Sequence, residues 1–90
     1  MHTYEAIEKH MMVLITRLTN TLDDVDIEYA TELVHAGEYG VSLEFICEQL
    51  YENEYTITMD IYRIIVDLCM TMNIPKQHYE MLKENIKDSS

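Results

Sequence analysis

Residues 58–72, TMDIYRIIVDLCMTM, carry the clearest helical pattern in the chain. Apolar side chains recur there at steps of three and four residues, at Ile61, Ile64, Ile65, Leu68 and Met72. This spacing is typical of a helix with one apolar face, and Thr58 directly before it is a favourable N-cap. Such a helix must bury its apolar face against other elements. The stretch therefore predicts a helical domain with a packed core.

Working outward from this stretch, the same periodicity predicts further helices at about residues 4–22, 25–35 and 43–53, and a last one that begins near Pro75. We expect Thr3, Asp24 and Ser42 to act as N-caps for the first three of these. Gly37 is placed to end the second, and Gly40 permits a turn before Ser42. Two Gly and one Pro are too few for a chain of many short strands. The sequence predicts a compact, all-α, single-domain bundle of about five short helices, covering residues 1–90.

Length and composition limit the class of protein. Ninety residues make one domain, and a chain with 48% hydrophobic and 26% charged residues is not expected to be disordered. The apolar run at residues 11–15 is too short for a signal-peptide core or a membrane span. We therefore expect a soluble protein of the cytoplasm. Cys47 and Cys69 lie in apolar helical patterns, so we expect them to be reduced core residues.

Negative charge is concentrated in the middle of the chain. The whole sequence has 17 Asp and Glu against six Lys and Arg, for a formal net charge of −11. Residues 18–62 contain no Lys or Arg but eleven acids: Asp23, Asp24, Asp26, Glu28, Glu32, Glu38, Glu44, Glu48, Glu52, Glu54 and Asp60. This balance rules out a general nucleic-acid binder and argues against binding to an anionic membrane surface. A partner attracted by charge should be basic.

Many of these acids are spaced so that they repel one another. They recur every four residues in two series, Asp24, Glu28 and Glu32, then Glu44, Glu48 and Glu52. Four like-charge pairs at this spacing cost about 1–2 kcal/mol in total. The acids could form a solvated face that keeps the protein soluble, paired with Lys or Arg of the flanking helices, or a surface kept for a basic partner. Both interpretations remain open.

Phe45 raises a similar question. This residue, the only Phe, lies with Glu48 and Glu52 on the side of its helix away from Leu43 and Leu50. It is either part of the core or an apolar anchor beside acids, an arrangement typical of interface hot spots. The same alternatives apply to the tyrosines at positions 29, 39, 51 and 55.

Catalysis is not expected. Glu32 and His35 form one Glu-x-x-His motif, whereas helical di-iron sites use two copies. Neither cysteine has the electropositive surroundings of a nucleophile. The sequence contains no Gly-rich phosphate loop and no serine elbow. We expect no enzyme activity, no metal and no cofactor.

Two segments resemble a known family. Residues 32–40, ELVHAGEYG, followed by residues 43–52, LEFICEQLYE, are similar to the MafI-like immunity proteins, which are called CdiI in contact-dependent growth inhibition systems. The similarity extends over about residues 29–83. It implies an α-helical, non-catalytic protein that binds and neutralises a cognate toxin domain in the bacterial cytoplasm. The related toxins are often nucleases, including ribonucleases of the EndoU-like and ribonuclease A-like kinds.

The resemblance supplies no contact residue, because its matched positions are those of the fold. From the acids and tyrosines we predict the following partner-binding residues: Asp23, Asp24, Glu28, Glu32, Glu38, Tyr39, Glu52, Glu54 and Tyr55. The expected partner is the C-terminal domain of a toxin, a basic nuclease bound one to one, with no direct contact to nucleic acid or membrane. Two other functions stay open. The chain could be an acidic mimic of nucleic acid, or an adaptor for basic proteins outside any toxin system.

Overall fold

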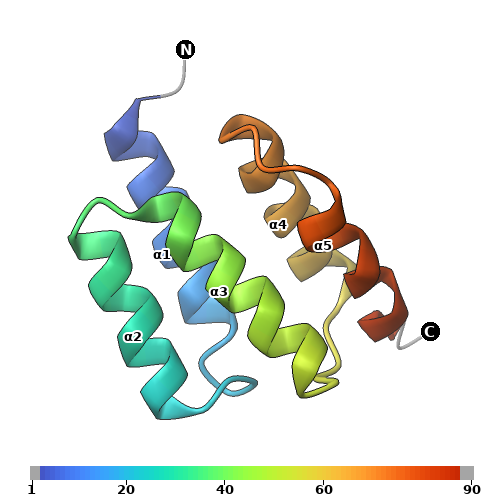
Figure 1. The fold of residues 1–90 in the computed structure, drawn as a ribbon. Coiled ribbons are helices and arrows are strands. Elements are labelled where there is room, and N and C mark those ends of the chain that lie inside the picture. Colours follow the sequence, from blue (N-terminus) through green and yellow to red (C-terminus); the bar gives the residue numbers. More distant parts are fainter. Residues whose placement is uncertain (1–2, 88–90) are drawn as a thin grey trace.

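Helices form nearly all of the regular structure in the computed structural model, which describes residues 3–87 (Figure 1). The elements are α1 (Tyr4–Arg17), α2 (Asp24–His35), α3 (Tyr39–Glu52), α4 (Met59–Thr71), the single turn α5 (Gln77–Glu80) and the 3-10 helix η1 (Met81–Asn85). Residues 3–87 contain no strand, and their one isolated β-bridge is parallel and joins Ile57 to Ile86. The predicted all-α bundle is confirmed.

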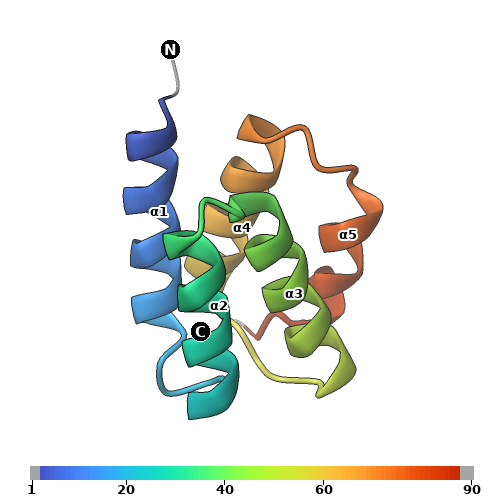
Figure 2. The ribbon, with the colours of Figure 1, turned by 60° about the vertical axis from the view of Figure 1, so that its left-hand side comes forward.

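Helix α3 is the centre of the bundle. It packs against every other helix, including the C-terminal turns α5 and η1. Helices α2 and α3 run antiparallel as a hairpin (Figure 1), and α1 and α5 lie on opposite sides of the molecule (Figure 2). Leu43, Ile46 and Leu50 of α3 are fully buried against apolar side chains of α1, α4 and η1. The core therefore lies behind the hairpin, and the other side of the hairpin is left to solvent.

The first and fourth helices begin as predicted. The hydroxyl oxygen of Thr3 accepts a hydrogen bond from the backbone N–H of Ala6 at 3.1 Å. That of Thr58 accepts one from Ile61 at 3.2 Å. Each contact satisfies a donor that the first turn of a helix leaves without a partner. The side chain of Thr58 thus fixes the start of α4.

The predicted start of the third helix is wrong. Helix α3 begins at Tyr39, so Gly40 and Ser42 are helical residues and neither forms a turn or a cap. The chain reverses earlier, within three residues, because Gly37 takes the left-handed conformation with φ 81°. The backbone N–H of Glu38 then bonds to the carbonyl of Leu33 at 2.8 Å, which closes α2. Ser42 is fully buried instead.

Other boundaries also differ. Helix α1 ends at Arg17 and not near residue 22, although Leu18 and Leu22 are still buried in the turn that follows. Helix α2 begins one residue early, with Asp23 and not Asp24 at the N-cap position. The last helical segment begins at Gln77, beyond Pro75. Tyr4, the first residue of α1, is 80% exposed although it is aromatic.

Three helices end on a residue with positive φ. Gly37 follows α2, Glu54 follows α3 with φ 52°, and Asn73 follows α4 with φ 57°. In each case the next backbone N–H reaches back to a carbonyl in the last turn of the helix, at 2.8–3.0 Å. This is the Schellman arrangement, which usually places Gly at the left-handed position. Glu54 and Asn73 occupy it at a steric cost that Gly does not pay.

No helix in the part of the chain that the structure describes is long and apolar enough to cross a membrane.

Candidate protein-binding surface

The solvent side of the α2–α3 hairpin is lined with carboxylates. All six acids of the two four-residue series are exposed. Residues 3–87 contain one ion pair within 4.0 Å, and it joins Lys9 to Glu5 on α1. The acids of α2 and α3 therefore have no Lys or Arg partner among the described residues. Within this part of the chain, no basic side chain of a flanking helix pairs with them.

Two aromatic rings lie between the helices on this side. The rings of Tyr29 on α2 and Phe45 on α3 meet edge to face, with centroids 4.8 Å apart and an interplanar angle of 77°. Tyr29 is 47% exposed, and Phe45 is partly buried and packs against the core. The sequence left Phe45 as either a core residue or an apolar anchor on the surface. Its ring has features of both, because it packs against the core and is not fully covered. Tyr29 was not among the predicted contact residues.

Two valines extend this apolar centre. Val25 is 77% exposed and Val41 is 49% exposed. Each lies four residues before the ring on its own helix, so it shares the face of that ring. Because the two helices are antiparallel, the valines lie on opposite sides of the ring pair. We call this surface the α2–α3 face; it consists of Val25, Glu28, Tyr29, Glu32, Val41, Glu44, Phe45 and Glu48.

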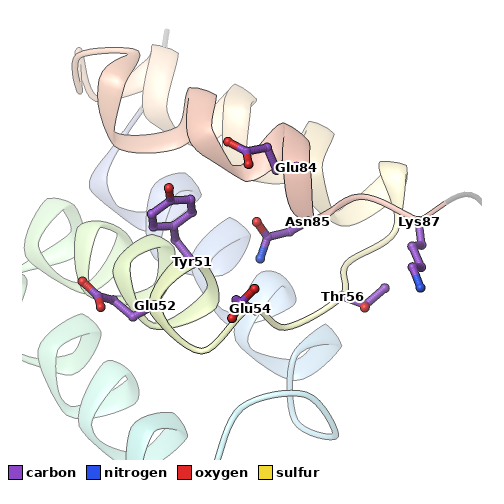
Figure 3. Close-up of a pocket in the computed structure, with 7 residues that line it drawn as sticks. All are labelled: Tyr51, Glu52, Glu54, Thr56, Glu84, Asn85 and Lys87. Atoms are coloured by element: carbon purple, nitrogen blue, oxygen red, sulfur yellow. The ribbon is translucent and has the colours of Figure 1, made fainter.

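A separate concavity of about 530 Å³ lies at the C-terminal end of α3 (Figure 3). It is lined by Tyr51, Glu52, Glu54, Thr56, Glu84, Asn85 and Lys87. The side-chain amide of Asn85 donates hydrogen bonds to the carbonyls of Leu50 and Tyr55, each at 2.9 Å. These bonds hold η1 against the end of α3, and so bring Glu84 to the same concavity as Glu52 and Glu54. Three carboxylates and a phenol ring can accept a Lys or Arg side chain.

The predicted contact residues divide among three places. Asp23, Asp24, Glu28 and Glu32 lie along α2, and Glu52 and Glu54 lie at the C-terminal end of α3. Glu38 and Tyr39 lie at the other end of the hairpin, where α2 turns into α3. The structure therefore spreads these residues along the hairpin and does not gather them at one point.

The side chains of Tyr39 and Tyr55 make contacts within the protein. The hydroxyl of Tyr39 donates a hydrogen bond to Glu8 of α1 at 3.3 Å. Desolvation and the neighbouring Glu8 carboxylate raise the pKa of Tyr39 above its ordinary value. Tyr55 is partly buried and packs against the core. Both side chains thus have intramolecular contacts that the spacing of residues could not reveal.

The remaining chemical groups do not gather into a site. Glu32 and His35 are both exposed, and the described residues contain no group of three or more His, Cys, Asp or Glu that could hold a metal ion. Cys47 and Cys69 are buried and unpaired in the part that the structure describes. The neighbouring Cys69 thiol and burial raise the pKa of Cys47, so this thiol stays protonated at neutral pH.

Comparison of the chain with models of protein families, with curated proteins and with solved structures gives no match. The two segments that resemble MafI-like immunity proteins, residues 32–40 and 43–52, lie on α2, α3 and the turn between them. They belong to the same hairpin as the exposed carboxylates and the aromatic pair.

Proposed function

We propose that this chain is an immunity protein that binds and neutralises a cognate toxin domain, a nuclease with a basic active-site cleft. One observation carries the proposal. The exposed acids of the α2–α3 hairpin have no basic partner among the described residues, in a 45-residue stretch, 18–62, without Lys or Arg. The resemblance of the same hairpin to MafI-like immunity proteins supports it. The site of action that follows is the cytoplasm of the cell that makes the protein.

The proposed mechanism is electrostatic capture followed by exclusion of the substrate. A ribonuclease has to present Lys, Arg or His side chains to the phosphates of RNA, so the entrance to its active site is electropositive. An acidic helical hairpin is complementary to such an entrance and repels RNA from it. Opposite charge also raises the rate of encounter between the two proteins. A fast encounter limits the number of RNA molecules that a toxin cleaves before it is captured.

The decisive experiment titrates the toxin domain encoded immediately upstream with this protein while RNA cleavage is followed at low and at high salt. We expect inhibition that is complete at one equivalent, with nanomolar affinity that persists at high salt. An unrelated basic ribonuclease serves as the control and should stay active. Absence of inhibition, or of a toxin gene beside this one, would contradict the proposal.

The same titration separates the alternatives. A mimic of nucleic acid would inhibit the control ribonuclease as well, and its binding would weaken uniformly as salt rises. An adaptor for basic proteins outside toxin systems would bind without protecting cells that express the toxin domain. A solvated face kept only for solubility would bind neither nuclease.

A further inference from the structure

We infer that the Tyr29–Phe45 pair is the anchor of the α2–α3 face, the point at which a basic partner inserts an apolar side chain that is surrounded by Lys and Arg. This inference rests on the proposed function and specifies how the partner is recognised. It differs from the contact set predicted from the sequence, which contains neither ring.

The first observation is that the fold covers the Tyr29–Phe45 pair only in part, Tyr29 being exposed and Phe45 partly buried. Tyr29 is 47% exposed, and the core behind the hairpin is already filled by fully buried residues of α3 such as Leu43 and Ile46. Large aromatic side chains are costly to leave in water. Val25 and Val41 widen the apolar area on both sides of the rings. Three exposed apolar residues around the partly buried ring of Phe45, at the centre of one face, have the composition expected of an interface core.

The second observation is the charge around the pair, which decides the kind of partner. Glu28, Glu32, Glu44 and Glu48 are all exposed, and neither helix of the hairpin contains Lys or Arg. If a second copy of this chain bound through the same face, the carboxylates of the two copies would face and repel one another. An anionic membrane and a nucleic acid are repelled for the same reason. The partner that fits this face is therefore a protein whose surface has an apolar centre surrounded by Lys and Arg.

The rim and the centre are expected to contribute differently. Exposed charges at the edge of an interface mainly affect the association rate and its dependence on salt. Aromatic residues that lose all solvent contact on binding dominate the lifetime of the complex, because their truncation leaves a cavity in a dry region. Removal of either ring should therefore act on dissociation and not on association.

The test measures association and dissociation rates of this protein on an immobilised, catalytically inactivated form of the upstream toxin domain. For Tyr29→Ala we expect dissociation to be at least 30-fold faster, which corresponds to about 2 kcal/mol. Tyr29→Phe keeps the ring and should bind within about threefold of the wild type. The matched control is Tyr4→Ala, an exposed tyrosine on α1, which should also bind within about threefold.

Phe45 requires a milder substitution, since its ring also packs against the core. Phe45→Leu keeps most of the buried volume, and a thermal melt checks that the fold is retained. Faster dissociation of Tyr29→Ala and Phe45→Leu, with unchanged Tyr4→Ala, would support the anchor. Wild-type binding that neither substitution weakens would overturn the anchor and leave the proposed function intact. Absence of wild-type binding would overturn both.

Discussion

The hydroxyl of Ser42 on α3 donates a hydrogen bond to the carbonyl of Ala30 on α2 at 2.9 Å, and both residues are fully buried. Two small side chains at this crossing let the helices approach closely. The hydrogen bond satisfies the only buried polar side chain among the core residues of the described chain. Tyr29 lies one residue before Ala30 on α2, and Phe45 lies three residues after Ser42 on α3, so the same register brings their rings together. The crossing thus positions the aromatic pair.

Substitution of Ser42 tests this crossing. Ser42→Ala removes the hydrogen bond but keeps the size, so we expect a loss of about 1 kcal/mol in the free energy of unfolding. Ser42→Val adds bulk where no space exists and should cost about 2–3 kcal/mol. Urea denaturation measures both, with Thr16→Ala on the exposed side of α1 as a control that changes by less than about 0.5 kcal/mol. A valine variant as stable as the wild type would contradict the close approach of α2 and α3.

Charge reversal on α2 should separate stability from binding. Glu28 has a like charge four residues away on each side, at Asp24 and Glu32. Glu28→Lys converts both repulsions to attractions and should raise the free energy of unfolding by about 1 kcal/mol. The same change should slow association with the toxin domain about tenfold at low salt, and the difference should shrink as salt rises. Glu28→Gln should fall between the wild type and the lysine variant in both measurements. Unaltered association of Glu28→Lys would exclude this part of α2 from the interface.

Glu54 occupies a strained position at the end of α3. Because its φ is 52°, replacement by Gly should relieve the left-handed strain and raise the stability by about 0.5–1 kcal/mol. The converse control is Gly37→Ala, at φ 81°, which should lower the stability by about 1 kcal/mol. Thermal melts of both variants measure these changes. Destabilisation by Glu54→Gly would show that the carboxylate makes a contact that outweighs the strain.

The buried thiol of Cys47 predicts how stability depends on pH. Its pKa is raised in the folded protein by the Cys69 thiol and by burial, so only the unfolded chain loses this proton near the ordinary thiol pKa of about 8.5. The unfolded state then binds fewer protons than the folded state. The stability is therefore fully present below about pH 8.5 and should fall by about 1.4 kcal/mol per pH unit above it. Urea denaturation between about pH 8 and pH 9.5 measures this slope. Cys47→Ala should be flatter over the same range, and an equal slope in that variant would assign the effect to other groups.

The helices could be predicted from the sequence because their signals are local. The apolar stripe of α4 and the hydroxyl caps at Thr3 and Thr58 depend on residues three or four positions apart. Ser42 was assigned wrongly because a serine suits an N-cap as well as a close crossing between helices, and only the packing of α2 against α3 distinguishes the two. The left-handed end at Glu54 could not be predicted, because a glutamate seldom takes this conformation, whereas Asn73 is of a residue type that can replace Gly there.

The candidate surface was harder to predict than the fold. The four-residue spacing of the acids placed them on a solvated side of their helices, and all six acids of the two series are exposed. Glu52, Glu54 and Glu84 line one concavity because η1 folds back on α3. No local sequence pattern encodes this packing. The pairing of Tyr29 with Phe45 depends in the same way on the register of two helices. A signal was nevertheless present, since Val25 and Val41 each stand four residues before a ring.

The hairpin that carries the α2–α3 face is one uninterrupted piece of chain, from Asp24 to Glu52. Its outward residues other than Phe45 are exposed, whereas its inward residues, such as Leu43 and Leu50, are fully buried. Under the proposed function, partner recognition and folding would be encoded by different positions of a single segment. A chimaera that exchanges only the outward positions between two such proteins would carry the choice of partner with it, while the rest of the scaffold stays unchanged.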